Sequence, residues 1–109
     1  MPVISQDNQF QTVITTYDVT PANFPDLVAL LKEACHDFMR NQPGFVGGAM
    51  HVNDAQTRVA NYTQWACRED FLALTRSAEM QAYNARYAAL SKSFKPIMYD
   101  VIMSVDADS

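Results

Sequence analysis

The stretch that decides the fold is residues 44–65, GFVGGAMHVNDAQTRVANYTQW. Its two ends, 44–53 and 57–65, are rich in the β-branched and aromatic residues that strands prefer. Asn53 and Asp54 between them are residues that form tight turns. The stretch therefore predicts a β-hairpin near the middle of the chain.

Strand and helix patterns continue on both sides of this hairpin. The expected elements are, in order, a strand over residues 10–17, a helix over about 21–41 capped by Thr20, the hairpin, a helix from Arg68, a third helix capped by Ser77, and a last strand over about 97–105 with Pro96 at its start. This β-α-β-β-α-β order is typical of an α+β, ferredoxin-like split β-α-β fold with an antiparallel sheet. We expect a single domain over residues 9–106, after a flexible tail over residues 1–8.

The composition combines many apolar residues with few charged ones. Of 109 residues, 49% are hydrophobic and 18% are charged, and the net charge is −4, whereas about a quarter of an average soluble domain is charged. The 8 Lys and Arg residues are scattered, which argues against nucleic-acid binding. No apolar run approaches the about 20 residues of a membrane span, and no signal peptide is visible. We therefore expect no membrane association and a cytoplasmic location, which the two cysteines fit.

A sheet of this fold carries its helices on one face and leaves the other face bare. The last expected strand is apolar on both sides, with Ile97, Tyr99 and Val101 alternating with Met98 and Ile102. Such a pattern is typical of a strand that is covered on both faces. We therefore expect a homodimer in which two sheets cover each other.

The register of the hairpin decides which side chains can line a pocket. A three-residue loop pairs Ala49 with Asn61 and places His51, Asn61 and Trp65 on one face, because successive side chains of a strand alternate. On the partner strand, only the small residues Gly47 and Ala49 lie beside them. This register predicts room for a flat ligand next to Asn61.

The third helix offers side chains that complement this pocket. Arg86 lies between Tyr83 and Tyr87, one helical turn from each. A guanidinium pointing at the sheet needs an acceptor, and a ligand carbonyl or phenolate would serve, with the tyrosines stacking or donating hydrogen bonds. Arg86 could instead pair with Glu79 or with the region of Asp100.

Structural interpretations compete with these functional ones. Trp65 at a strand end is also typical of a core aromatic, and His51 is also typical of a surface histidine, opposite Arg58 if the loop has an even number of residues. Asn61 is harder to explain structurally, because a buried amide is costly without partners. No spacing of histidine, cysteine and carboxylate predicts a metal site.

Four short segments carry a resemblance to a known family. They are Gln42-Pro43-Gly44-Phe45-Val46, Met50-His51, Val59-Ala60-Asn61-Tyr62-Thr63-Gln64-Trp65 and Arg68-Glu69-Asp70-Phe71. In this order they resemble the antibiotic biosynthesis monooxygenase family, over about residues 9–105. The resemblance implies a ferredoxin-like subunit, a dimeric α+β barrel, and a pocket between helices and sheet in each subunit.

The family includes small oxygenases that convert phenolic anthrones to quinones with O₂ and without flavin, haem or metal. The resemblance therefore implies a cofactor-independent monooxygenase, with an electron-rich aromatic molecule and O₂ as its partners. By the same resemblance, Asn61 and Arg86 polarise substrate oxygens, His51 is the base, and Trp65 stacks on the rings. Phe71 stands where some members have a substrate-binding tyrosine.

Three alternatives belong to other classes of function. A haem-degrading relative needs an axial histidine on the pocket helix, and residues 71–95 contain none. An RNA-binding module with this element order would need basic residues beside its aromatic strand. A non-catalytic, or differently specific, small-molecule-binding dimer of the same fold stays open.

Overall fold

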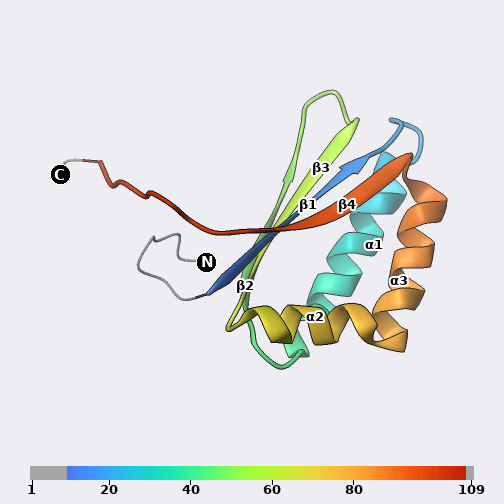
Figure 1. Cartoon of the computed structure of the whole chain (residues 1–109). Helices are drawn as coiled ribbons and strands as arrows, with labels where there is room; N and C mark the ends of the chain where they lie inside the picture. Colours follow the sequence, from blue (N-terminus) through green and yellow to red (C-terminus); the bar gives the residue numbers. More distant parts are fainter. Residues whose placement is uncertain (1–9, 108–109) are drawn as a thin grey trace.

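A four-stranded antiparallel sheet with three α-helices on one face forms the body of the protein (Figure 1). The computed structural model describes residues 10–107. Its elements are β1 (Gln11–Asp18), α1 (Phe24–Asp37), the 3₁₀ turn η1 (Met39–Asn41), β2 (Phe45–Val52), β3 (Arg58–Trp65), α2 (Arg68–Arg76), α3 (Ala78–Leu90) and β4 (Ser93–Tyr99). The strand order β2-β3-β1-β4 confirms the α+β ferredoxin-like fold. The tail expected over residues 1–8 lies outside the described residues.

The core lies between the helices and alternate residues of the two central strands. On β3, Val59, Asn61, Thr63 and Trp65 face the helices and are buried. Successive side chains of a strand point to opposite faces, so every second residue of β3 faces the core. Asn61 and Thr63 are thus two polar side chains between the apolar Val59 and Trp65 on this inner face.

The helix boundaries depend on local capping signals. Ser77 caps α3 as expected, because its hydroxyl accepts a hydrogen bond of 3.1 Å from the Met80 amide. The predicted start of α1 was wrong by about one turn: α1 begins at Phe24, and Pro25 occupies its first turn. Thr20 instead closes the preceding turn, where its hydroxyl accepts from the Asn23 amide.

The hairpin register differs from the predicted one over most of its length. Phe45 pairs with Trp65 as expected, but an irregularity between Phe45 and Gly47 shifts the pairing by one residue. His51 consequently pairs with Ala60. Because a shift by one residue moves a side chain to the other face, His51 lies on the face away from the helices.

The turn of the hairpin explains this shift. The Asn53 side-chain oxygen accepts hydrogen bonds from the amides of Thr57 and Arg58, at 3.0 and 2.9 Å. The Asn53 amide in turn donates to the Arg58 carbonyl at 3.3 Å. The loop thus closes on the pair Asn53 and Arg58 and is longer than the expected three residues.

The last strand was predicted too late in the chain. Pairing with β1 begins at once after α3, with Ser93 opposite Asp18, and ends with Tyr99 opposite Thr12. Pro96 lies within the strand and not at its start, which an edge strand tolerates. Beyond Tyr99 the described chain runs away from the sheet (Figure 1).

Candidate active site

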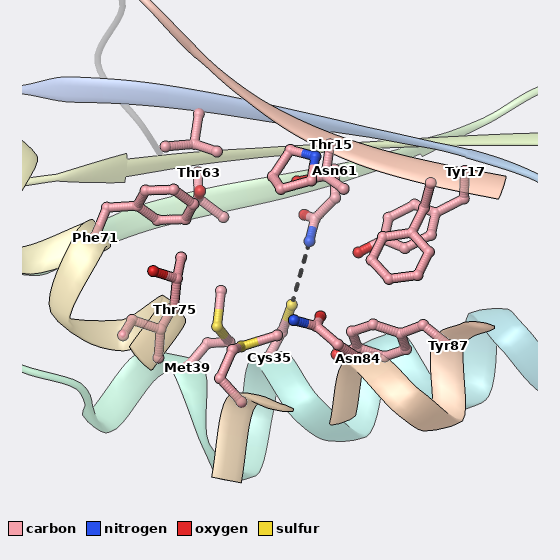
Figure 2. A pocket seen from close by; sticks show the side chains of 15 residues that line it. Thr15, Tyr17, Cys35, Met39, Asn61, Thr63, Phe71, Thr75, Asn84 and Tyr87 are labelled. Atoms are coloured by element: carbon pink, nitrogen blue, oxygen red, sulfur yellow. Dashed lines mark hydrogen bonds between the residues drawn. The ribbon is translucent and has the colours of Figure 1, made fainter. Parts of the chain in front are cut away.

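Two hollows lie between the sheet and the helices. The inner cavity, about 50 Å³, is enclosed by the sheet and all three α-helices. Its walls include Asn61, Thr63, Cys35, Phe71, Asn84 and Tyr87 (Figure 2). It has room for small molecules only, since a cavity that holds one benzene ring measures about 150 Å³.

The groove is the second hollow, and it lies between α1 and the β2 edge of the sheet. Its volume is about 670 Å³, within the range of roughly 300–1,000 Å³ that is usual for small-molecule sites. Gly48, Ala49 and Met50 of β2 line one side, and His36 and Arg40 line the other. This hollow has the size for a polycyclic aromatic molecule.

Three side chains belong to both hollows. Cys35, Asn61 and Thr63 line the inner cavity and also the groove. The amide nitrogen of Asn61 donates to the Cys35 sulfur at 3.9 Å, the contact drawn as a dashed line in Figure 2. The Asn61–Cys35 contact therefore lies where the two hollows meet.

Asn61 has hydrogen-bonding capacity left at this junction. The residue is 7% exposed, and within the described part of the chain no donor contacts its side-chain oxygen. Burial raises the pKa of the Cys35 thiol, although the hydrogen bond from Asn61 lowers it in part. Cys35 is accordingly a neutral thiol near pH 7, and Asn61 is a dipole held beside it in a low-dielectric setting.

Aromatic residues close the inner cavity from two sides. Tyr87 is 3% exposed and meets Tyr17 edge-on, with ring centroids 5.7 Å apart. Burial raises the pKa of both phenols well above the ordinary value. Both therefore stay protonated at neutral pH, and neither is available as a general base. Phe71 forms the opposite wall.

Trp65 lies behind the wall of the cavity and does not line it. It is completely buried, and its indole nitrogen donates to the Thr63 hydroxyl at 3.1 Å. Its ring packs against Phe45 and Phe71, with centroids 5.3 and 5.8 Å away. Trp65 thus holds two residues that do line the cavity, Thr63 and Phe71, in place.

The other predicted site residues are not brought to Asn61. His51 is exposed on the helix-free face, with its Nδ1 3.3 Å from the Ala60 carbonyl oxygen. Arg86 pairs with Glu33 of α1 at 3.5 Å and lies 5.6 Å from the Tyr83 ring centroid. Arg86 thus pairs with neither of the expected carboxylates, and more than half of its side chain is exposed.

The remaining two predicted contacts differ from each other. Ala49 lines the groove, although it pairs with Tyr62 and not with Asn61. Tyr83 is half-buried against Phe38, with ring centroids 5.4 Å apart, and lines neither hollow. Of the predicted site residues, Asn61, Phe71 and Tyr87 therefore line the inner cavity and Ala49 lines the groove, whereas His51, Trp65, Tyr83 and Arg86 line neither hollow.

Similarity to known proteins agrees with this architecture. The sequence model of one family, described as antibiotic biosynthesis monooxygenase, matches residues 10–86. The chain belongs to this family. A curated relative, the tetracenomycin-F1 monooxygenase of Streptomyces glaucescens, is 29% identical over 109 residues, covering 100% of this chain and 96% of the relative.

Solved structures share the fold of this family member. SnoaB from Streptomyces nogalater, described as a cofactor-independent oxygenase, superposes with a TM-score of 0.73 at 19% identity, covering 91% of this chain and 99% of SnoaB. A protein from Shewanella oneidensis superposes with a TM-score of 0.74 at 19% identity, covering 85% of this chain and 91% of that one. At 19% identity, this likeness shows a shared fold.

Sequence reasoning missed three residues of the site in this family member. Thr63 follows Asn61 by two positions on the same strand, so the alternation that selected Asn61 also selects Thr63. Asn84 interrupts the apolar face of α3 one turn from Met80, which is a usable signal. Cys35 continues the apolar face of α1, and nothing local distinguishes it from a packing residue.

Two further observations concern the described part of the chain. Between residues 10 and 107, histidine, cysteine and carboxylate side chains form no group of three that could hold a metal ion. Over the same residues, every helix is too short or too polar to span a bilayer.

Proposed function

We propose that this protein is a cofactor-independent monooxygenase that oxidises an electron-rich phenolic aromatic, an anthrone or a related quinol, to a quinone with O₂. The observation that carries the proposal is the buried Asn61 amide at the junction of the groove and the inner cavity. The names of two relatives support it, one a tetracenomycin-F1 monooxygenase and the other a cofactor-independent oxygenase.

The size of the groove supports the substrate class. A ring system with three or four fused rings fits about 670 Å³ but not about 50 Å³. Its flat face lies along Gly48 and Met50, and one edge reaches Asn61. Gly48 leaves this side of the groove without a side chain. A Cβ at this position would crowd β3, since it would lie 2.9 Å from the Tyr62 carbonyl oxygen and 3.2 Å from the Thr63 methyl.

The chemistry follows from the electronic state of the reactants. Triplet O₂ reacts slowly with closed-shell molecules, so an electron-rich substrate anion must supply the electrons. In the case of an anthrone, the methylene carbon loses four electrons and two protons. One atom of O₂ becomes the new carbonyl oxygen, and the other leaves as water after a substrate hydroperoxide has formed.

The protein contributes by positioning and by electrostatics. Asn61 hydrogen-bonds a substrate oxygen and stabilises the charge that develops on it, which a preorganised dipole in a buried site does more strongly than water. Phe71 and Tyr87 exclude water from the reacting edge. Trp65 is a positioning residue that acts through Thr63. His51 and Arg86 have no part in this proposal, because they lie away from Asn61.

Oxygen consumption tests the proposed reaction. Metal-free protein is incubated with dithranol, an anthrone, while O₂ uptake and the quinone absorbance are followed. We expect a clear acceleration, and a loss of about 10²–10³-fold in kcat/KM for Asn61→Ala, the size of effect seen when one oxyanion donor is removed. Tyr62→Phe, one residue along β3 but on the other face, is the matched control and should react like the wild type.

Two outcomes would overturn this function. One is a rate equal to the spontaneous oxidation of dithranol. The other is the same acceleration in Asn61→Ala as in the wild type. Dithranol binding without any acceleration would instead identify a small-molecule-binding protein.

We also propose that the functional unit is a homodimer formed through the helix-free face. Ile97 and Tyr99 are 40% and 45% exposed there. Beyond β4, Ile102 and Val105 are more than 80% exposed on the segment that runs away from the sheet. Burial of such surface stabilises association. A light-scattering mass equal to one chain at micromolar concentration would contradict the dimer.

A further inference from the structure

Asn84 is the amide that α3 contributes to the inner cavity (Figure 2). Met80 and Tyr87, one helical turn away on either side, line the same cavity. Asn84 is half-buried, and its side chain has no hydrogen-bond partner among residues 10–107. A sheltered amide is costly unless water or a ligand meets it, so Asn84 has both a donor and an acceptor to offer to an occupant of the cavity.

The sheet offers further polar groups from the opposite side of the cavity. Thr15 and Asn61 are partners across β1 and β3, so their side chains lie next to each other on the helix-covered face. Within residues 10–107, the Thr15 hydroxyl has no hydrogen-bond partner and the Asn61 oxygen has no donor. A ligand edge that carries two polar atoms can therefore be bound from the sheet and from α3 at once.

The walls of the inner cavity carry no formal charge. Its titratable side chains are Tyr17, Cys35 and Tyr87, and burial raises the pKa of each, so all three stay neutral near pH 7. The other side chains of residues 10–107 that line it are amides, hydroxyls or apolar groups. Such walls suit hydroxyl and carbonyl groups, whereas a carboxylate or phosphate would be buried without a counter-charge.

The cavity can be reached from the groove and can be widened. The two hollows meet at Asn61 and Cys35, so a ligand edge that passes Asn61 enters the cavity that Asn84 lines. The volume of about 50 Å³ holds a few waters but not a ring. Met39 and Met80 are part of the wall, and their unbranched thioether side chains repack readily. Their rotation would admit the edge of a ring between the sheet and the helices.

We propose that Asn84 is a specificity-determining residue, which hydrogen-bonds a phenolic hydroxyl of the substrate beside the carbonyl oxygen bound by Asn61. The proposal rests on the proposed function and narrows its substrate class to aromatics with a hydroxyl peri to that carbonyl. In such a molecule the two oxygens lie on one edge, where amides of β3 and α3 can bind both. A site built to hydrogen-bond a substrate hydroxyl also discriminates against the analogue that lacks it.

Binding of two quinones tests this role without turnover. The pair is 1,8-dihydroxyanthraquinone and anthraquinone, which differ only in the two hydroxyls. Quenching of Trp65, the single tryptophan of the chain, reports binding. We expect the wild type to prefer the hydroxylated quinone, and Asn84→Leu to bind it about five- to tenfold more weakly, the effect of one neutral hydrogen bond. The affinity of Asn84→Leu for anthraquinone should match that of the wild type.

A matched variant controls for general effects on the helix. Gln81→Leu also removes an amide from α3, but Gln81 is exposed and lines neither hollow, so both affinities should stay unchanged. If Asn84→Leu does not fold, Asn84→Ala replaces it, since alanine is the best helix former. An equal loss for both quinones in the Asn84 variant, or no loss for either, would overturn the proposed role. A wild type without any preference would overturn it too.

Turnover supplies an independent readout. Dithranol carries hydroxyls peri to its carbonyl and unsubstituted anthrone carries none. Asn84→Leu should lower kcat/KM for dithranol by about five- to tenfold, as one lost hydrogen bond does, and leave kcat/KM for anthrone unchanged. An equal fall for both substrates would contradict the role in specificity. If the wild type oxidises neither substrate but prefers the hydroxylated quinone, the proposed function fails and the role of Asn84 in recognition stands, so the two failures are distinguishable.

Discussion

Asn61 and Tyr62 are neighbours on β3, yet the two faces of the sheet give them opposite surroundings. The Asn61 amide lies among helices, contacts Cys35 and borders both hollows. The Tyr62 hydroxyl lies on the helix-free face, buried and without a hydrogen-bond partner among residues 10–107. The helix-covered face thus offers a polar group to a ligand inside the subunit. The helix-free face offers apolar and unpaired groups to the proposed second subunit. A single step along a strand separates the two roles.

Removal of Trp65 should have the largest effect on stability. It tests whether the helix-covered face of the sheet is a packed wall that Trp65 supports. We expect Trp65→Ala to lower the free energy of unfolding by about 3–5 kcal/mol, as for other large buried aromatic residues, because it also leaves the Thr63 hydroxyl without its donor. Urea unfolding measures this. Trp65→Phe, which keeps an aromatic ring at the same place, is the control and should cost less. Full stability of Trp65→Ala would mean that Trp65 serves the ligand and not the wall.

Asn61→Leu separates function from stability on the same face. We expect kcat/KM to fall by about 100-fold or more, since the dipole at the junction is lost. The free energy of unfolding should change by only about 1 kcal/mol, because the partner left behind is the Cys35 sulfur, a weak acceptor at 3.9 Å. Parallel kinetics and urea unfolding give both quantities. A large loss of stability with little loss of rate would make Asn61 a structural residue.

Alkaline pH provides a milder probe of the helix-covered face. Burial raises the pKa of Tyr17 in the folded state above the value near 10 of the unfolded chain. Above that pH the unfolded state loses a proton that the folded state keeps, so stability falls as pH rises, by about 1.4 kcal/mol per pH unit for this group. Tyr17→Phe should lose part of this slope between pH 10 and 11 and match the wild-type slope near pH 7.5. An unchanged slope in Tyr17→Phe would contradict the burial argument.

His51→Ala should have the smallest effect and tests the register that separates the two faces. Because His51 points away from Asn61, we expect its removal to leave kcat/KM for dithranol within about twofold, far from the 10²–10⁴-fold contribution of a general base. A tenfold or larger loss would mean that His51 takes part in the reaction, in conflict with the observed pairing with Ala60. His36→Ala, a histidine at the rim of the groove, is a useful comparison.

Much of the fold could be predicted because its signals are local. The Ser77 cap, the alternation of Val13, Thr15 and Tyr17, and the apolar face of α1 each depend on residues within a few positions of one another. The placement of Asn61 on the helix-covered face also followed from alternation along one strand. These inferences needed no knowledge of which segments meet in space.

The errors arose where distant segments decide the outcome. The pairing of β4 is fixed by the eight residues of β1, so the apolar alternation past Tyr99 has no strand partner within residues 10–107. The direction of Arg86 depends on Glu33, which is more than 50 positions away along the chain. Neither constraint can be read from the neighbouring sequence.

The sequence by itself determined the element order, the helix-facing set on each central strand and the presence of an amide among apolar residues. Hydrophobic periodicity and capping are short-range, and they suffice for those features. The one-residue shift that moves His51 to the outer face is set by the local turn at Asn53, whereas tertiary structure alone decided the contact between Arg86 and Glu33. It also divided the interior into a groove and a small cavity, because the shape of an enclosed space depends on how side chains from separate elements pack together.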